Sequence, residues 1–170
     1  MNRYLFAAEA GPVVAQVGHH SIPSTSLVMQ GFNRRGVSIG AQSPELGTSL
    51  TAFSVRSQDV AGFQSGFGTE DPENRTSGVV LSSQPIRSQR DALALSATYV
   101  NGQGPSQTGT IGTGIASDST SGSGRAAGIV ADSNLFERRL RLRGEFASSE
   151  FDLDGRGRDA DLNGTIDSNL

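Results

Sequence analysis

The sequence has no cysteine, no lysine, no tryptophan and no long apolar run. Without cysteine there is neither a disulfide framework nor a thiolate metal site, which excludes disulfide-stapled scaffolds and zinc fingers. Without a run of about 18 apolar residues the sequence predicts no transmembrane helix. All 14 basic residues are arginine, and a formal net charge of −3 gives no reason to expect nucleic acid as a partner.

Glycine, serine and threonine are abundant, with 22 glycines among 170 residues. Many short apolar runs separated by such residues favour strands and turns over helices, so we expect a single all-β domain covering residues 1–170. Serines are plentiful, but no G-x-S-x-G elbow occurs, and the carboxylates cluster in segments that look like loops. We therefore expect no catalytic activity.

The most regular stretch is R-R-L-R-L-R-G-E-F-A at Arg138–Ala147. A strict two-residue period places one set of side chains on each face of a strand, whereas a helix would leave no apolar stripe. Three arginines at alternate positions seldom face a dry core, so their face must meet water or a wet interior. The apolar set is Leu140, Leu142, Gly144 and Phe146, and the charged set is Arg139, Arg141, Arg143 and Glu145.

Similar short runs recur along the chain, and a Pro- and Gly-containing turn at Ser43–Gly47 joins two of them into a predicted hairpin. The count is about eight to ten strands, which we expect to form an antiparallel meander. Residues 101–124 are predicted to be a low-complexity Gly/Ser/Thr loop, and residues 150–170 an acidic loop or tail. The paired histidines His19 and His20 fall in a polar connection and are predicted to lie in a loop.

The N-terminal segment lacks the apolar stretch of a signal peptide, because Glu9 interrupts it. The last residues, Asp167–Leu170, look like a cut through a loop or the start of another strand. We therefore expect the chain to be a piece of a longer protein.

Three stretches, R-L-R-L-R-G-E-F-A-S-S-E-F-D, A-L-A-L-S-A-T-Y-V-N-G-Q and T-S-L-T-A-F-S-V-R-S, resemble strands of Gram-negative outer-membrane β-barrel proteins. The resemblance is one of pattern and covers most of the chain. It implies a barrel, or part of one, in the bacterial outer membrane with a structural, transport or export role. It also implies contact with a lipid bilayer or detergent, and a wet lumen lined by Arg139, Arg141, Arg143 and Glu145. An anionic solute or another envelope protein would be a further partner.

A different motif lies near the end of the chain, in D-A-D-L-N-G-T-I-D. Oxygen-bearing side chains at alternate positions and a glycine at the sixth suit Ca²⁺, which takes six to eight oxygen ligands. This spacing resembles the calcium loops of dockerins, EF-hands and integrin propellers, and the alternative interpretation is a solvated acidic loop. No other cofactor is expected. The candidate ligands are Asp159, Asp161, Asn163, Thr165 and Asp167.

A soluble β-sandwich is the alternative fold, because two packed sheets also produce many strands. The corresponding function is a secreted or surface-exposed interaction or adhesion module that uses the predicted calcium loop at 159–167.

Overall fold

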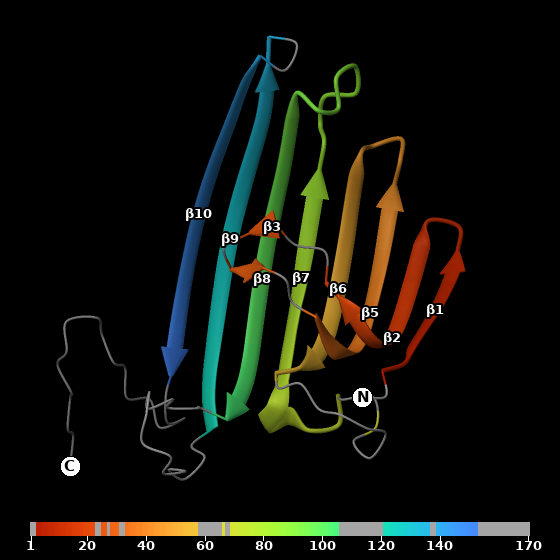
Figure 1. Cartoon of the computed structure of the whole chain (residues 1–170), viewed down its shortest axis with the longest axis vertical. Helices are drawn as coiled ribbons and strands as arrows, with labels where there is room; N and C mark the ends of the chain where they lie inside the picture. Colours follow the sequence, from red (N-terminus) through yellow and green to blue (C-terminus); the bar gives the residue numbers. More distant parts are fainter. Residues whose placement is uncertain are drawn as a thin grey trace, which may run out of the picture.

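Eight strands form one antiparallel sheet in the order β1-β2-β5-β6-β7-β8-β9-β10, as Figure 1 shows. The computed structural model describes residues 3–22, 25–26, 28–30, 33–57, 66, 69–105, 121–136 and 139–152. Leaving aside the short strands β3 and β4, every strand pairs with its neighbours along the chain. The predicted all-β antiparallel meander is thus confirmed. The strands are β1 (Leu5–Ala10), β2 (Val13–Ser21), β5 (Asn33–Ser43), β6 (Thr48–Arg56), β7 (Arg75–Ser83), β8 (Leu93–Pro105), β9 (Ser121–Leu135) and β10 (Leu140–Asp152).

The sheet is not closed, and β1 and β10 are its two edges. A 3-10 turn, η1 (Pro72–Asn74), precedes β7. No helix in the described part of the chain is long and apolar enough to cross a membrane. The predicted hairpin is present, since β5 ends at Ser43 and β6 begins at Thr48, with Gly47 in the turn at a φ of 62°. That left-handed conformation costs glycine little because glycine has no Cβ.

Several strands are longer than the sequence predicted. The segment at 101–124 is not all loop, because residues 101–105 belong to β8 and residues 121–124 to β9. Backbone pairing explains the difference, since Gly102 lies opposite Gly124 and needs no apolar side chain to join the ladder. In the same way β10 runs to Asp152, so the acidic segment predicted at 150–170 begins inside a strand.

The two histidines also lie on a strand, and their predicted placement in a loop is wrong. β2 extends to Ser21 because His19 and His20 pair with Arg35 and Arg34 of β5. The two rings make separate contacts. The ring of His19 meets the Tyr4 ring edge-on with centroids 5.8 Å apart, whereas Nδ1 of buried His20 lies 3.0 Å from the carbonyl oxygen of Gly18.

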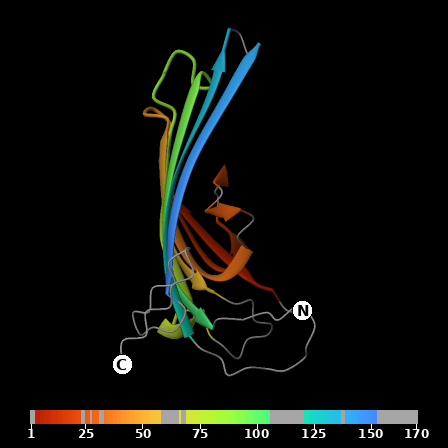
Figure 2. The same ribbon diagram turned by 90° about the vertical axis from the view of Figure 1, so that its left-hand side faces the viewer.

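The sheet is curved, and the connection between β2 and β5 lies against its concave side (Figure 2). This connection contains β3 (Thr25–Ser26) and β4 (Met29–Gln30), which pair with each other. The contact between this connection and the sheet forms the main apolar core of the described residues. Burying each large apolar side chain there stabilises the fold by about 1.5–3 kcal/mol. The core consists of Ile22 and Met29 from the connection and Phe53, Val55 and Val80 from the sheet.

Connections differ in length between the two ends of the sheet. At the end where β9 turns into β10 the connections are short, at residues 11–12, 44–47, 84–92 and 136–139. At the opposite end they are longer, at residues 22–32, 57–74 and 106–120. The meander therefore has one compact rim and one rim with long connections.

The glycine at position 78 allows β7 to pass close to the core. A Cβ at Gly78 would lie 2.5 Å from the carbonyl oxygen of Tyr99 and 2.6 Å from Cζ of Phe53. We expect Gly78→Ala to lower the free energy of unfolding by about 1–3 kcal/mol through overpacking. Urea unfolding followed by circular dichroism measures it. Gly144 has nothing within 4 Å of its added Cβ, so Gly144→Ala is the control and should change stability by less than about 0.5 kcal/mol. Equal effects at the two positions would contradict the packing around Gly78.

Candidate functional site

The register gives the sheet two different faces. Residues directly opposite each other in an antiparallel pair point to the same side, and this relation extends from strand to strand. Starting from Asp132 of β9, the same face includes Arg143 of β10 and Ala94 of β8. It also includes Phe53 and Val80, which pack against the connection that contains β3 and β4, so it is the concave face.

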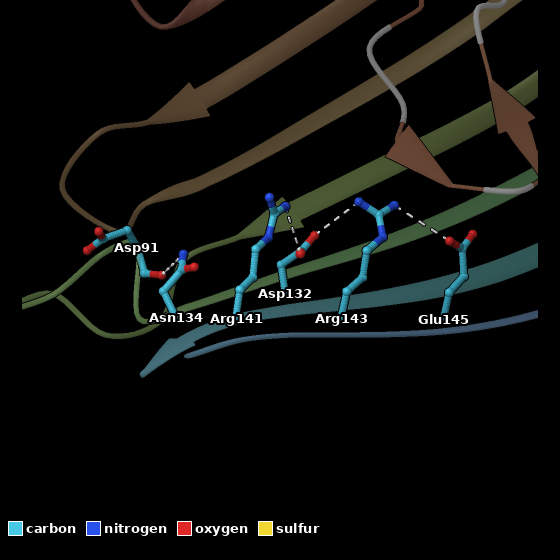
Figure 3. A network of polar contacts seen from close by, with 6 residues as sticks. All are labelled: Asp91, Asp132, Asn134, Arg141, Arg143 and Glu145. Carbon is cyan, nitrogen blue, oxygen red and sulfur yellow. Dashed lines mark hydrogen bonds and ion pairs between the residues drawn. The ribbon is translucent and has the colours of Figure 1, made fainter. Parts of the chain in front are cut away.

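Three of the four predicted lumen residues lie together on the concave face. Arg141, Arg143 and Glu145 stand at alternate positions of β10, and Asp132 of β9 faces them (Figure 3). Arg139 lies in the turn one residue before β10 begins, where its backbone N–H donates to the carbonyl oxygen of Phe136 at 3.1 Å. Reasoning from the sequence missed Asp132, because its place opposite Arg143 depends on the register between the two strands.

A continuous chain of ion pairs links these groups (Figure 3). Nη2 of Arg141 donates to Oδ1 of Asp132 at 3.1 Å, and Nη1 of Arg143 lies 3.4 Å from Oδ2 of the same carboxylate. Nη2 of Arg143 lies 3.6 Å from Oε2 of Glu145. Asp132 thus bridges two like charges that a strand period holds about 7 Å apart. The carboxylates are the shielded partners, with side chains 21% exposed at Asp132 and 11% at Glu145, and Arg141 is 66% exposed.

A polar groove of about 450 Å³ lies next to this network, between the β5–β6 and β7–β8 turns. Its lining includes Asp132 and Arg90, and the guanidinium of Arg90 donates to the carbonyl oxygen of Pro44. Hydroxyl and amide groups supply most of the remaining polar atoms, so the groove offers donors and acceptors to a hydrated solute. These groups belong to Gln42, Ser43, Thr48, Ser49, Ser82, Ser83, Gln84 and Ser96.

The convex face is apolar and exposed. Its large apolar side chains come from seven of the eight strands of the sheet, and even Phe6 and Phe146 at the two edges are 66% and 72% exposed. Alternation along single strands was visible in the sequence, but the alignment of these residues into one band required the register. The band consists of Phe6, Ile39, Leu50, Leu81, Leu95, Tyr99, Ile129, Leu135, Leu140, Leu142 and Phe146.

An ion pair lies on the convex face, near the rim with the long connections. Nε of Arg125 donates to Oε2 of Glu150 at 2.7 Å, and both side chains are largely exposed. The hydrogen bond and the charge of Glu150 raise the pKa of Arg125 above its already high value. The pair marks a hydrated margin of the apolar band.

The predicted calcium ligands Asp159, Asp161, Asn163, Thr165 and Asp167 lie outside the described residues. Within the described ranges, no group of three or more His, Asp and Glu side chains is placed to hold a metal ion. The site that the structure does present is a polar concave surface with a charged network, backed by an apolar convex surface.

Comparison with known proteins finds no match of this chain to a protein-family model, a curated protein or a solved structure.

The carboxylate of Asp132 should contribute to the stability of the fold, because it lies between Arg141 and Arg143 and pairs with both. We expect Asp132→Asn to lower the free energy of unfolding by up to about 1 kcal/mol at low salt, since exposed pairs contribute this much or less. The loss should shrink in 1 M salt, where the screening length falls to about 3 Å. Urea unfolding at two salt concentrations measures both.

Glu150→Gln is the matched control for this carboxylate. It breaks a single ion pair in which both side chains are more than half exposed, so its effect should be the smaller of the two. A larger loss in Glu150→Gln than in Asp132→Asn would contradict the bridging role of Asp132.

Proposed function

We propose that this chain forms part of a β-barrel of the bacterial outer membrane, with its convex face toward lipid and its concave face toward a wet lumen. The role would be structural or in transport or export, without catalysis. The bilayer would be the principal partner, and a polar or anionic solute, or another envelope protein, would meet the concave face.

The apolar band carries this proposal. A water-soluble monomer seldom exposes apolar patches larger than a few hundred Å², and such patches otherwise mark contact with protein or membrane. Here exposed apolar side chains from seven of the eight strands, including both edges, lie on the convex face, whereas Leu5 is the one exposed large apolar side chain that the described strands place on the concave face. The hydrocarbon of a lipid bilayer suits an apolar band of this extent, because lipid can cover the band without a complementary surface on a second protein.

The concave face supports the same function from the other side. Serine, threonine, glutamine and glycine dominate it near the short turns, and the ion pairs of Asp132, Arg141, Arg143 and Glu145 cross it. Such a surface is stable in contact with water but would be costly in hydrocarbon. In outer-membrane barrels the residues of each strand alternate between apolar side chains that face lipid and polar side chains that face the interior.

The unequal connections give an orientation. Outer-membrane barrels have short turns on the periplasmic side and long loops outside. The compact rim at residues 11–12, 44–47, 84–92 and 136–139 would then face the periplasm. The groove beside Asp132 and Arg90 would open near the periplasmic end of the lumen, where its hydrogen-bonding groups and arginines would contact a passing solute.

Two neighbouring positions on β8 test the assignment of the faces. Leu95 lies in the convex band, and Ser96 lines the concave groove. We expect Leu95→Arg to lower the stability of the protein in lipid vesicles by up to about 2–4 kcal/mol, the cost of arginine near the bilayer midplane. Ser96→Arg should be mild because its guanidinium reaches water.

Unfolding in urea from vesicles measures both substitutions, with the unsubstituted protein as reference. Equal tolerance of the two arginines would contradict the proposed faces. A monomeric, folded protein in buffer without detergent or lipid would favour the soluble interaction module instead.

A further inference from the structure

Two arginines stand directly opposite each other on the convex face, near the rim with the long connections. Arg56 ends β6 and Arg75 begins β7, and the register pairs them. They lie on the convex face because Val55, which precedes Arg56, packs into the core of the concave face. Like charges directly opposite each other in a sheet are destabilising. The pair therefore needs a negative charge to offset it.

The described residues do not supply this charge. Within the described ranges neither Arg56 nor Arg75 makes an ion pair, whereas Arg125 on the same face is neutralised by Glu150. The Nε atom of Arg56 is also buried, and it donates no hydrogen bond to the described part of the chain. A buried N–H group without an acceptor is costly. An anion in contact with the two guanidinium groups would remove both costs.

Uncharged hydrogen-bonding groups surround the two arginines on the same face. Ser54 and Ser77 stand opposite each other, and the hydroxyl of Ser77 donates to Oγ of Ser54 at 3.0 Å. The hydroxyl hydrogen of Ser54 is thereby left to donate to a further acceptor. Guanidinium, amide and hydroxyl donors in one place suit the oxygens of a phosphate group. The whole group, which we call the arginine patch, consists of Ser54, Arg56, Arg75, Ser77, Asn101 and Gln103.

The arginine patch adjoins the apolar band. On β8 the convex face passes from Leu95 and Tyr99 of the band to Asn101 and Gln103 of the patch. Gln103 lies about 13 Å beyond Tyr99 along the strand, which is about 10 Å in height if the strand tilts as in membrane barrels. Lipid headgroups lie just outside the hydrocarbon core of a bilayer. A lipid with its acyl chains against Tyr99 therefore has its headgroup at the patch.

We propose that the arginine patch binds the phosphate of an anionic lipid whose acyl chains cover Val79 and Tyr99. The guanidinium groups of Arg56 and Arg75 hold the phosphate oxygens through charge-assisted hydrogen bonds. A lipid suits the patch better than a soluble phosphate does, because the patch and the apolar band are continuous on one face. The inference rests on the membrane function proposed above, and adds to it a class of lipid and a place where that lipid binds.

The absence of tryptophan makes this site testable by fluorescence. Tyr99→Trp places a single fluorophore next to the patch, and Leu95→Trp places one on the same face of β8 but four positions further away. Each full chain is inserted into vesicles of equal parts phosphatidylcholine and phosphatidylglycerol, in which the acyl chains of one lipid or of the other carry bromine. Bromine quenches tryptophan on contact, so the two measurements show which lipid lies against each position.

At position 99 we expect the association of phosphatidylglycerol to exceed that of phosphatidylcholine by at least about fivefold, the factor that one arginine contributes near a lipid surface. Arg56→Gln combined with Arg75→Gln should reduce this preference to the level at position 95. The single substitution Arg75→Gln, at an exposed position, should reduce it part-way. Circular dichroism confirms that each variant is folded.

The matched control combines Arg87→Gln with Arg139→Gln, which change the net charge equally at the rim with the short turns. It should leave the preference at position 99 unchanged. Equal quenching by the two lipids at position 99, a preference that survives loss of Arg56 and Arg75, or an equal loss in the control would each overturn the lipid site. These results would leave the membrane function intact. Quenching by neither lipid at either position would contradict the membrane function itself, and the lipid site with it.

Discussion

The backbone ladder is the constraint on which the rest of the structure depends. It runs unbroken through eight strands, and because it fixes which residues stand opposite each other, it fixes the face of every side chain. A slip of one residue in β10 would move its arginines to the apolar face and its leucines to the polar one. The alternation along Leu140–Phe146 therefore produces one apolar and one polar face of the sheet only because the register aligns the other seven strands with it.

The alternation of single strands was predictable, and the features that depend on neighbouring strands were not. Arg141, Arg143 and Glu145 were placed on one face from spacing alone, because the period of a strand is local. Asp132 was missed since nothing in its own neighbourhood identifies its partner. The prediction that the two histidines lie in a loop was wrong because polar residues can join a ladder when a neighbouring strand is available. Here Arg34 and Arg35 of β5 stand opposite them. The glycine-rich ends of β8 and β9 were missed for the same reason.

The concave face has two regions with different chemistry. Toward the long connections, Ile22 and Met29 cover Phe53, Val55 and Val80 and make a dry core. Toward the short turns, the face is open and carries the groove and the chain of ion pairs. Apolar burial is thus concentrated in one half of this face, while the other half is open and polar. The charged network costs little there because its arginines remain in contact with water.

The most direct measurement of the central claim is a spin-label scan along residues 95–99 of β8, one cysteine at a time, in lipid vesicles. The accessibility of each label to oxygen, which concentrates in lipid, is compared with its accessibility to a water-soluble nickel complex. The account predicts alternation, with labels at Leu95, Ala97 and Tyr99 exposed to oxygen and labels between them shielded from it. High accessibility to the nickel complex at all three convex positions, or no two-residue period, would contradict a lipid-facing convex surface.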